Sequence, residues 1–235
     1  MRRFLFCCLA LLIADLRMAP AGAQGYPGGA GGIPPITGGG GRGGHEQEIP
    51  SAPAEVKPDK AAAKAYAAGT KTMLKAHELE DTIAKATDPD KKAKAMSKLE
   101  DVYGKALDQF TEVLRNKGEM YDAWNQIGYL HLRFGAYRES VDDYNHALRL
   151  KPDLLEAIAF RGEAYLGIDH LEEAKAAYMD LFFHARPLAD HLMIGMQAWL
   201  QQHRAAANGM RAQDIDAFDK WLQERDGIAK TTAAN

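Results

Sequence analysis

Two stretches of this chain repeat each other at an offset of 34 residues. Gly128 recurs as Gly162, Tyr144 recurs as Tyr178, and Phe110 stands one further step before Tyr144. A period of this length is typical of helical hairpins that stack side by side, because one hairpin alone cannot bury its apolar face. The period therefore predicts an all-α protein and a binding scaffold, with no sign of the chemistry of an enzyme.

Helix-forming residues dominate the chain from Lys60 onward. Ala, Leu, Lys, Glu and Met are frequent, and no stretch shows the sustained alternation of apolar and polar residues that strands have. Gly and Pro divide this part of the chain into segments. The expected breaks lie at Asp88-Pro89-Asp90, Gly118, Gly135, Lys151-Pro152-Asp153, Gly167 and Arg186-Pro187.

The clearest repeat runs from Tyr121 to Pro152 and resembles a tetratricopeptide repeat. The residues that carry this resemblance are Trp124, Ile127, Gly128, His131, Ser140, Tyr144, Ala147 and Pro152. His131 departs from the family pattern, which has Tyr there. The next repeat, from Leu155 to about Leu188, departs further, because Ile158 replaces the aromatic residue and Arg161 the usual Leu.

In such repeats the small residues mark the closest approach of the two helices of one hairpin. Gly128 with Ser140, and Gly162 with Ala174, occupy these positions. The large residues are expected to fill the space between adjacent hairpins. They are Trp124, Tyr144, Tyr165 and Tyr178.

The first hairpin is longer than the others. Ala106 and Phe110 are in register with the second helix of the repeat, and Gly69 is the best match for the small residue of the first helix. Gly69 and Ala106 are 37 residues apart, whereas Gly128 and Ser140 are 12 apart. This hairpin therefore carries an insertion of 25 residues.

The insertion predicts two long helices, over about 61–86 and 91–116, that turn at Asp88-Pro89-Asp90. Near the other end of the chain, residues 188–203 form a further expected helix. Ile215, Phe218, Trp221 and Leu222 recur at helical spacing and predict a capping helix. The expected fold is a TPR-like α-solenoid of about three helical hairpins, with an elongated first hairpin and a C-terminal capping helix, over residues 60–226. The tail, residues 227–235, is expected to fray.

The first 23 residues resemble a secretory signal. Two arginines precede an apolar run from Phe4 to Ile13, and Ala21-Gly22-Ala23 offers a cleavage site before Gln24. The run is shorter than the roughly 20 residues that span a bilayer, so we expect no membrane span after cleavage. Residues 24–59 are rich in Gly and Pro and predict a disordered linker. We therefore expect an exported protein, located in the periplasm or otherwise outside the cell.

Composition excludes several kinds of chemistry. Cys7 and Cys8 lie in the expected signal, so the mature chain has no thiol for a disulfide, a nucleophile or a metal site. Its net charge of −5 makes nucleic acid an unfavourable partner. No serine stands in a nucleophile motif, and the histidines are scattered. We therefore expect no cofactor, no metal and no enzyme.

The resemblance implies that the first helix of each hairpin lines a concave groove that holds a protein or peptide. The residues expected to be exposed there are Asp122, Asn125, Tyr129, Leu132, Arg133, Glu156, Ala159, Glu163 and Leu166. Asn125 could bond a peptide backbone, and Arg133 a carboxylate. The two glutamates favour a neutral or basic ligand. The alternative is that all nine are ordinary surface residues.

Other interpretations remain open at this point. The lysines at 91, 92, 94 and 98 could form a second contact surface, although the interspersed acidic residues favour a solvated helix face. The protein could also be a self-associating, homo-oligomeric component of the cell envelope, or an accessory subunit of an envelope enzyme.

Overall fold

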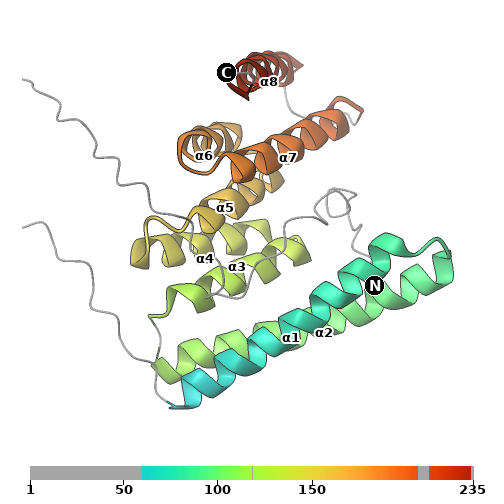
Figure 1. Ribbon diagram of the computed structural model, residues 1–235, viewed down its shortest axis with the longest axis vertical. Coiled ribbons are helices and arrows are strands. Elements are labelled where there is room, and N and C mark those ends of the chain that lie inside the picture. Colours follow the sequence, from blue (N-terminus) through green and yellow to red (C-terminus); the bar gives the residue numbers. More distant parts are fainter. Residues whose placement is uncertain (1–59, 118, 206–211, 234–235) are drawn as a thin grey trace, which may run out of the picture.

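The computed structural model describes residues 60–117, 119–205 and 212–233, and it is all-α over these residues (Figure 1). The expected signal peptide and linker lie outside the described residues. The helices are α1 (Lys60–Lys85), α2 (Pro89–Lys117), α3 (Tyr121–Phe134), α4 (Tyr137–Leu150), α5 (Leu155–Gly167), α6 (Leu171–His184), α7 (Arg186–Ala205) and α8 (Ala212–Ala233). Consecutive helices pack as hairpins, so the predicted TPR-like α-solenoid is confirmed.

The long first hairpin is also confirmed. Both helices continue through the insertion, and the hairpin projects beyond α3 and α4 (Figure 1). Asp88 caps α2, because its Oδ1 accepts the backbone N–H groups of Asp90 at 2.9 Å and Lys91 at 3.2 Å. Pro89 follows at the first helical position, where its missing N–H costs nothing.

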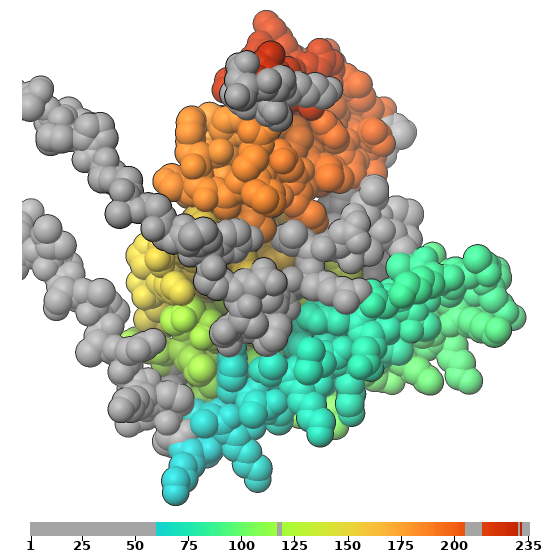
Figure 2. Space-filling view, in the orientation of Figure 1, coloured from blue at the N-terminus to red at the C-terminus, as the bar shows by residue number. Residues whose placement is uncertain are grey.

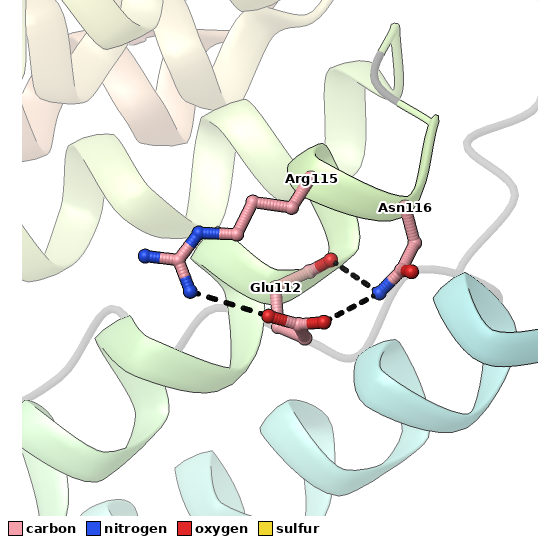
Figure 3. Close-up of polar contacts among 3 residues, drawn as sticks. All are labelled: Glu112, Arg115 and Asn116. Atoms are coloured by element: carbon pink, nitrogen blue, oxygen red, sulfur yellow. Dashed lines mark hydrogen bonds and ion pairs between the residues drawn. The ribbon is translucent and has the colours of Figure 1, made fainter.

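Near the far end of α2, three polar side chains form contacts with one another at the surface. Figure 3 shows the Glu112 carboxylate accepting hydrogen bonds from Arg115, at 3.3 Å, and from the Asn116 side chain, at 2.7 Å. Exposed pairs of this kind contribute at most about 1 kcal/mol. As a result, the Arg115 guanidinium is already paired with a carboxylate of its own helix.

The small residues lie at close contacts, as predicted. A methyl group added to Gly69 would come within 2.7 Å of the buried Phe110 ring, and one added to Gly128 within 3.0 Å of Tyr144. The Ser140 hydroxyl donates to the carbonyl of Gly128 at 2.8 Å. Gly162 differs in part, because its nearest neighbour is Leu192 of α7, the next hairpin along.

Gly135 ends α3 through its backbone conformation. Its φ of 73° is left-handed, and its N–H bonds back to the last turn of α3. The chain then reverses at once into α4. Of the large residues predicted between hairpins, Tyr144 stacks on Phe160 of α5, whereas Trp124 stacks on His146 within its own hairpin.

The last two helices close the end of the stack. Phe218 and Leu222 of α8 are buried against Trp199 of α7, which confirms the capping helix. The tail was predicted to fray from residue 227, whereas α8 continues to Ala233. Arg186 donates to the carbonyl of Ala229 at 3.1 Å, and this bond ties the end of α8 to the start of α7. None of the described helices is long and apolar enough to cross a bilayer.

Candidate functional site

The nine predicted groove residues lie on α3 and α5, but none of them is fully exposed. Asp122, Arg133 and Glu156 are half-buried. The other six are buried: Asn125, Tyr129, Leu132, Ala159, Glu163 and Leu166. The expectation of an open, exposed groove is therefore wrong for these six, whereas a role for them in binding stays a prediction.

The insertion in the first hairpin explains part of this burial. Glu80 of α1 accepts hydrogen bonds from Arg133 Nη2 and from the Tyr129 hydroxyl, each at 3.3 Å, and from the Tyr103 hydroxyl of α2. The Arg133 and Glu80 side chains are only 12% and 18% exposed. The cluster of these four residues, which we call the Glu80 cluster, fixes the insertion against α3 and uses two predicted groove residues.

Electrostatics favour one protonation state for three members of the Glu80 cluster, namely Tyr103, Tyr129 and Arg133. Burial raises the pKa of Tyr103 and of Tyr129 well above the usual range of tyrosine, so both hydroxyls stay protonated and donate. Burial alone would lower the pKa of Arg133, but Tyr129, Tyr103 and Glu80 outweigh it and raise this pKa. The cluster is a charged but internally satisfied contact between hairpins.

Glu163 of α5 has a different environment. Its side chain is 2% exposed, and neither carboxylate oxygen accepts a hydrogen bond from the described part of the chain. The nearest basic side chain is that of His191 on α7, whose Nδ1 lies 3.1 Å from Oε1 of Glu163. On α3, Asn125 Oδ1 is likewise buried without a donor. Two predicted groove residues thus present acceptors that lack partners, a costly arrangement in a protein interior.

Asp122 and Glu156 lie in the first turns of α3 and α5, where the helix dipole favours acidic residues. Burial, and next the Asp122 carboxylate, raises the pKa of Glu156, while Lys151 opposes this change. Of the two glutamates predicted to make this face acidic, Glu156 is half-buried and Glu163 is buried, so the preference for a neutral or basic ligand stays a prediction.

Replacing Glu156 with glutamine is expected to stabilise the protein at neutral pH. Because the pKa of this carboxyl is raised in the folded state, the folded protein binds its proton more tightly than the unfolded chain does. In wild type, ionisation of Glu156 destabilises the folded state, and this destabilisation sets in as pH rises above 4.5, the ordinary pKa of a glutamate side chain. The advantage of the variant should therefore grow between about pH 4 and pH 7 in thermal unfolding. An advantage that shrinks over this range would contradict the sign, and Glu139→Gln, on the exposed surface of α4, is the matched control.

His131 explains one departure from the repeat pattern. Its Nδ1 lies 2.6 Å from Oδ2 of Asp143 on α4, so a pair inside the hairpin stands where the family has Tyr. Burial raises the pKa of Asp143, and the contact with His131 lowers it in part. Among the described residues, no group of three or more His, Cys, Asp or Glu side chains could hold a metal ion.

Sequence reasoning missed Glu80 and His191. Glu80 belongs to the insertion, for which the repeat pattern has no register, and His191 lies in a helix that lacks the glycine of the pattern. A charged residue facing the apolar seam of the long hairpin was the available signal for Glu80. For His191 the chain offered none.

Comparisons with known proteins agree with this architecture. Residues 121–154 match the tetratricopeptide repeat family model. This segment is therefore similar to a tetratricopeptide repeat, and it lies within a TPR-like α-solenoid. The chain is 29% identical over 94 residues to "Protein SGT1 homolog" of Oryza sativa subsp. japonica. The aligned residues are 40% of this chain and 25% of that relative, so the chain spans about a quarter of the relative's length. No solved structure matches. A tetratricopeptide repeat suggests a scaffold for protein–protein interaction.

Proposed function

We propose that this protein is an exported, non-enzymatic scaffold that binds a protein or peptide through the inner face of α3 and α5. The observation that carries the proposal is the tetratricopeptide repeat at 121–154, since repeats of this kind present the first helix of each hairpin to a partner. The face in question is defined by Asp122, Asn125, Glu156 and Glu163.

The chemistry of this inner face favours a ligand that donates hydrogen bonds. Asn125 Oδ1 and the Glu163 oxygens accept no hydrogen bond from the described residues, and Asp122 and Glu156 add carboxylates at the edge. Arg133, the cation of the predicted groove, is already bound to Glu80. An extended segment with free N–H groups or basic side chains fits this face better than a terminal carboxylate. Because the acceptors are buried, side chains must move apart when the segment enters.

The binding surface is tested with variants that remove acceptors. The mature chain serves as bait in an envelope extract, and the retained protein is identified by mass spectrometry. Asn125→Ala and Glu163→Gln should each weaken the affinity for that protein about 10- to 100-fold, as expected for the loss of one buried hydrogen bond. Glu139→Gln should leave it unchanged. Arg133→Glu is a poor test, because it would also disrupt the Glu80 cluster.

The outcomes separate the parts of the proposal. A bait that retains nothing above an unrelated helical protein contradicts the scaffold function. A partner whose affinity is unchanged in both acceptor variants contradicts the inner face as the binding surface.

Export is tested by expression of the full chain in a Gram-negative host. We expect the protein in the periplasmic or extracellular fraction, with Gln24 as its first residue by N-terminal sequencing. Recovery in the cytoplasm with Met1 retained would contradict export. Arg2→Glu/Arg3→Glu should slow export, because a signal needs its basic start.

A further inference from the structure

Charge is distributed unevenly between the long hairpin and the rest of the stack. Residues 60–117 contain 12 Lys and Arg against 9 Asp and Glu, a net charge of +3. Residues 118–235 contain 12 against 18, a net charge of −6. The long hairpin is thus a basic element at one end of an acidic protein.

A crevice lies along this hairpin between α1 and α2. Its volume is about 530 Å³. Leu79 and Val102, both half-buried, form its apolar floor. Four exposed charged residues form its rim: Lys75 and Glu78 of α1, and Lys98 and Asp101 of α2. We call this feature the outer crevice.

The outer crevice faces away from α3. Glu80 reaches Arg133 of α3, and the neighbouring Leu79 points about 100° away from it around α1. On α2, Tyr103 contacts Phe134 of α3, whereas Val102 lines the crevice. An antiparallel helix pair has two grooves, so α3 packs on one and the outer crevice is the other. In Figure 2 the blue-green surface of this hairpin projects from one end of the molecule.

Lysines continue along both sides of the outer crevice at helical spacing. On α1 and α2 the exposed lysines of these two stripes are Lys64, Lys71, Lys75, Lys94, Lys98 and Lys105. None of the six forms an ion pair with a described residue. The exposed acidic residues at the same spacing are fewer: Glu78 on α1, and Asp90, Asp101 and Asp108 on α2. The face therefore combines a recessed apolar floor with an excess of unpaired positive charge.

We propose that the outer crevice is a second docking surface, which binds an acidic amphipathic helix of a partner protein. The ridge of apolar side chains on such a helix would fill the groove over Leu79 and Val102, in the way that ridges and grooves pack between helices. Its flanking Asp and Glu side chains would meet the lysine stripes. This surface is separate from the inner face of α3 and α5.

Other anionic partners fit these observations less well. A membrane surface takes up apolar side chains that protrude, whereas Leu79 and Val102 are recessed below charged neighbours. A phosphate backbone would leave the apolar floor unused and would meet Glu78 and Asp101 at the rim.

The test uses the full mature chain and two designed helical peptides of about 18 residues, a length that spans five turns. Both carry the same leucine stripe, and the flanking positions are Glu in one and Lys in the other. Fluorescence anisotropy should show that the Glu peptide binds at least about tenfold tighter, with an affinity that falls as salt rises. Lys75→Glu/Lys98→Glu should abolish this preference.

The control is Arg138→Glu/Lys220→Glu, which makes the same change in net charge at exposed positions of α4 and α8. This control variant should keep the preference for the Glu peptide. Asn125→Ala, on the inner face, should keep it too, so that a failure of the outer crevice is distinguished from a failure of the proposed function. Equal binding of the two peptides, no binding, or loss of the preference in both charge variants would overturn the proposal. Binding of anionic vesicles or single-stranded RNA that depends on Lys75 and Lys98, without binding of the Glu peptide, would overturn it in favour of those partners.

Discussion

Trp199→Ala is expected to lower the free energy of unfolding by about 3–5 kcal/mol, the range for truncating a large buried aromatic side chain. Trp199 is 2% exposed in the apolar cluster that α7 forms with α5, α6 and α8. Its ring meets Phe218 of α8 edge-on, with 5.4 Å between the ring centroids, and stacks on His203 at 3.8 Å. Removal of the ring leaves a cavity between α7 and the capping helix, so the packing of the capping helix on the stack is weakened most.

The measurement is urea denaturation followed by circular dichroism. Phe183→Ala is the matched control, because Phe183 is an aromatic residue of α6 that is 74% exposed. Its loss should change stability by less than about 0.5 kcal/mol. Similar losses for the two variants would show that α8 contributes little to the core.

Glu80→Ala is the second large expected effect, a loss of about 3 kcal/mol. The change removes the acceptor shared by Arg133, Tyr129 and Tyr103, and it leaves a guanidinium that is only 12% exposed without its partner. An unpaired charge in such a place costs more than the ion pair itself contributes.

A double variant separates these two terms. Glu80→Leu/Arg133→Leu removes both charges and should recover most of the loss, when measured by the same denaturation experiment. Glu78→Ala, at an exposed position half a turn away on α1, should be nearly neutral. If Glu80→Ala is no worse than Glu78→Ala, the Glu80 cluster does not hold the insertion on α3.

Much of the fold could be predicted because its signals are local or periodic. The helix boundaries follow from Asp88-Pro89, Gly135 and Pro152, which act on the backbone within one turn. The contact of Gly69 with Phe110, one repeat before the clearest unit, depends only on the requirement that a small residue face a large one. The end of α8 was missed, because its bond from Arg186 to Ala229 joins residues 43 positions apart.

The candidate site was predicted less well. The repeat pattern places Tyr129, Arg133 and Glu163 on the first helices of their hairpins, and they do lie there. Their burial could not be predicted, because it depends on Glu80 in an insertion and on His191 in a helix without the repeat's glycine.

The sequence by itself determined the helical hairpins, their order and the long first hairpin, since spacing and helix signals act along the chain. Only the tertiary structure decided which side chains remain reachable, because burial depends on helices that are distant in sequence. Packing drew the predicted groove residues into contacts between hairpins, and it left the lysine-lined crevice of α1 and α2 uncovered by the described helices.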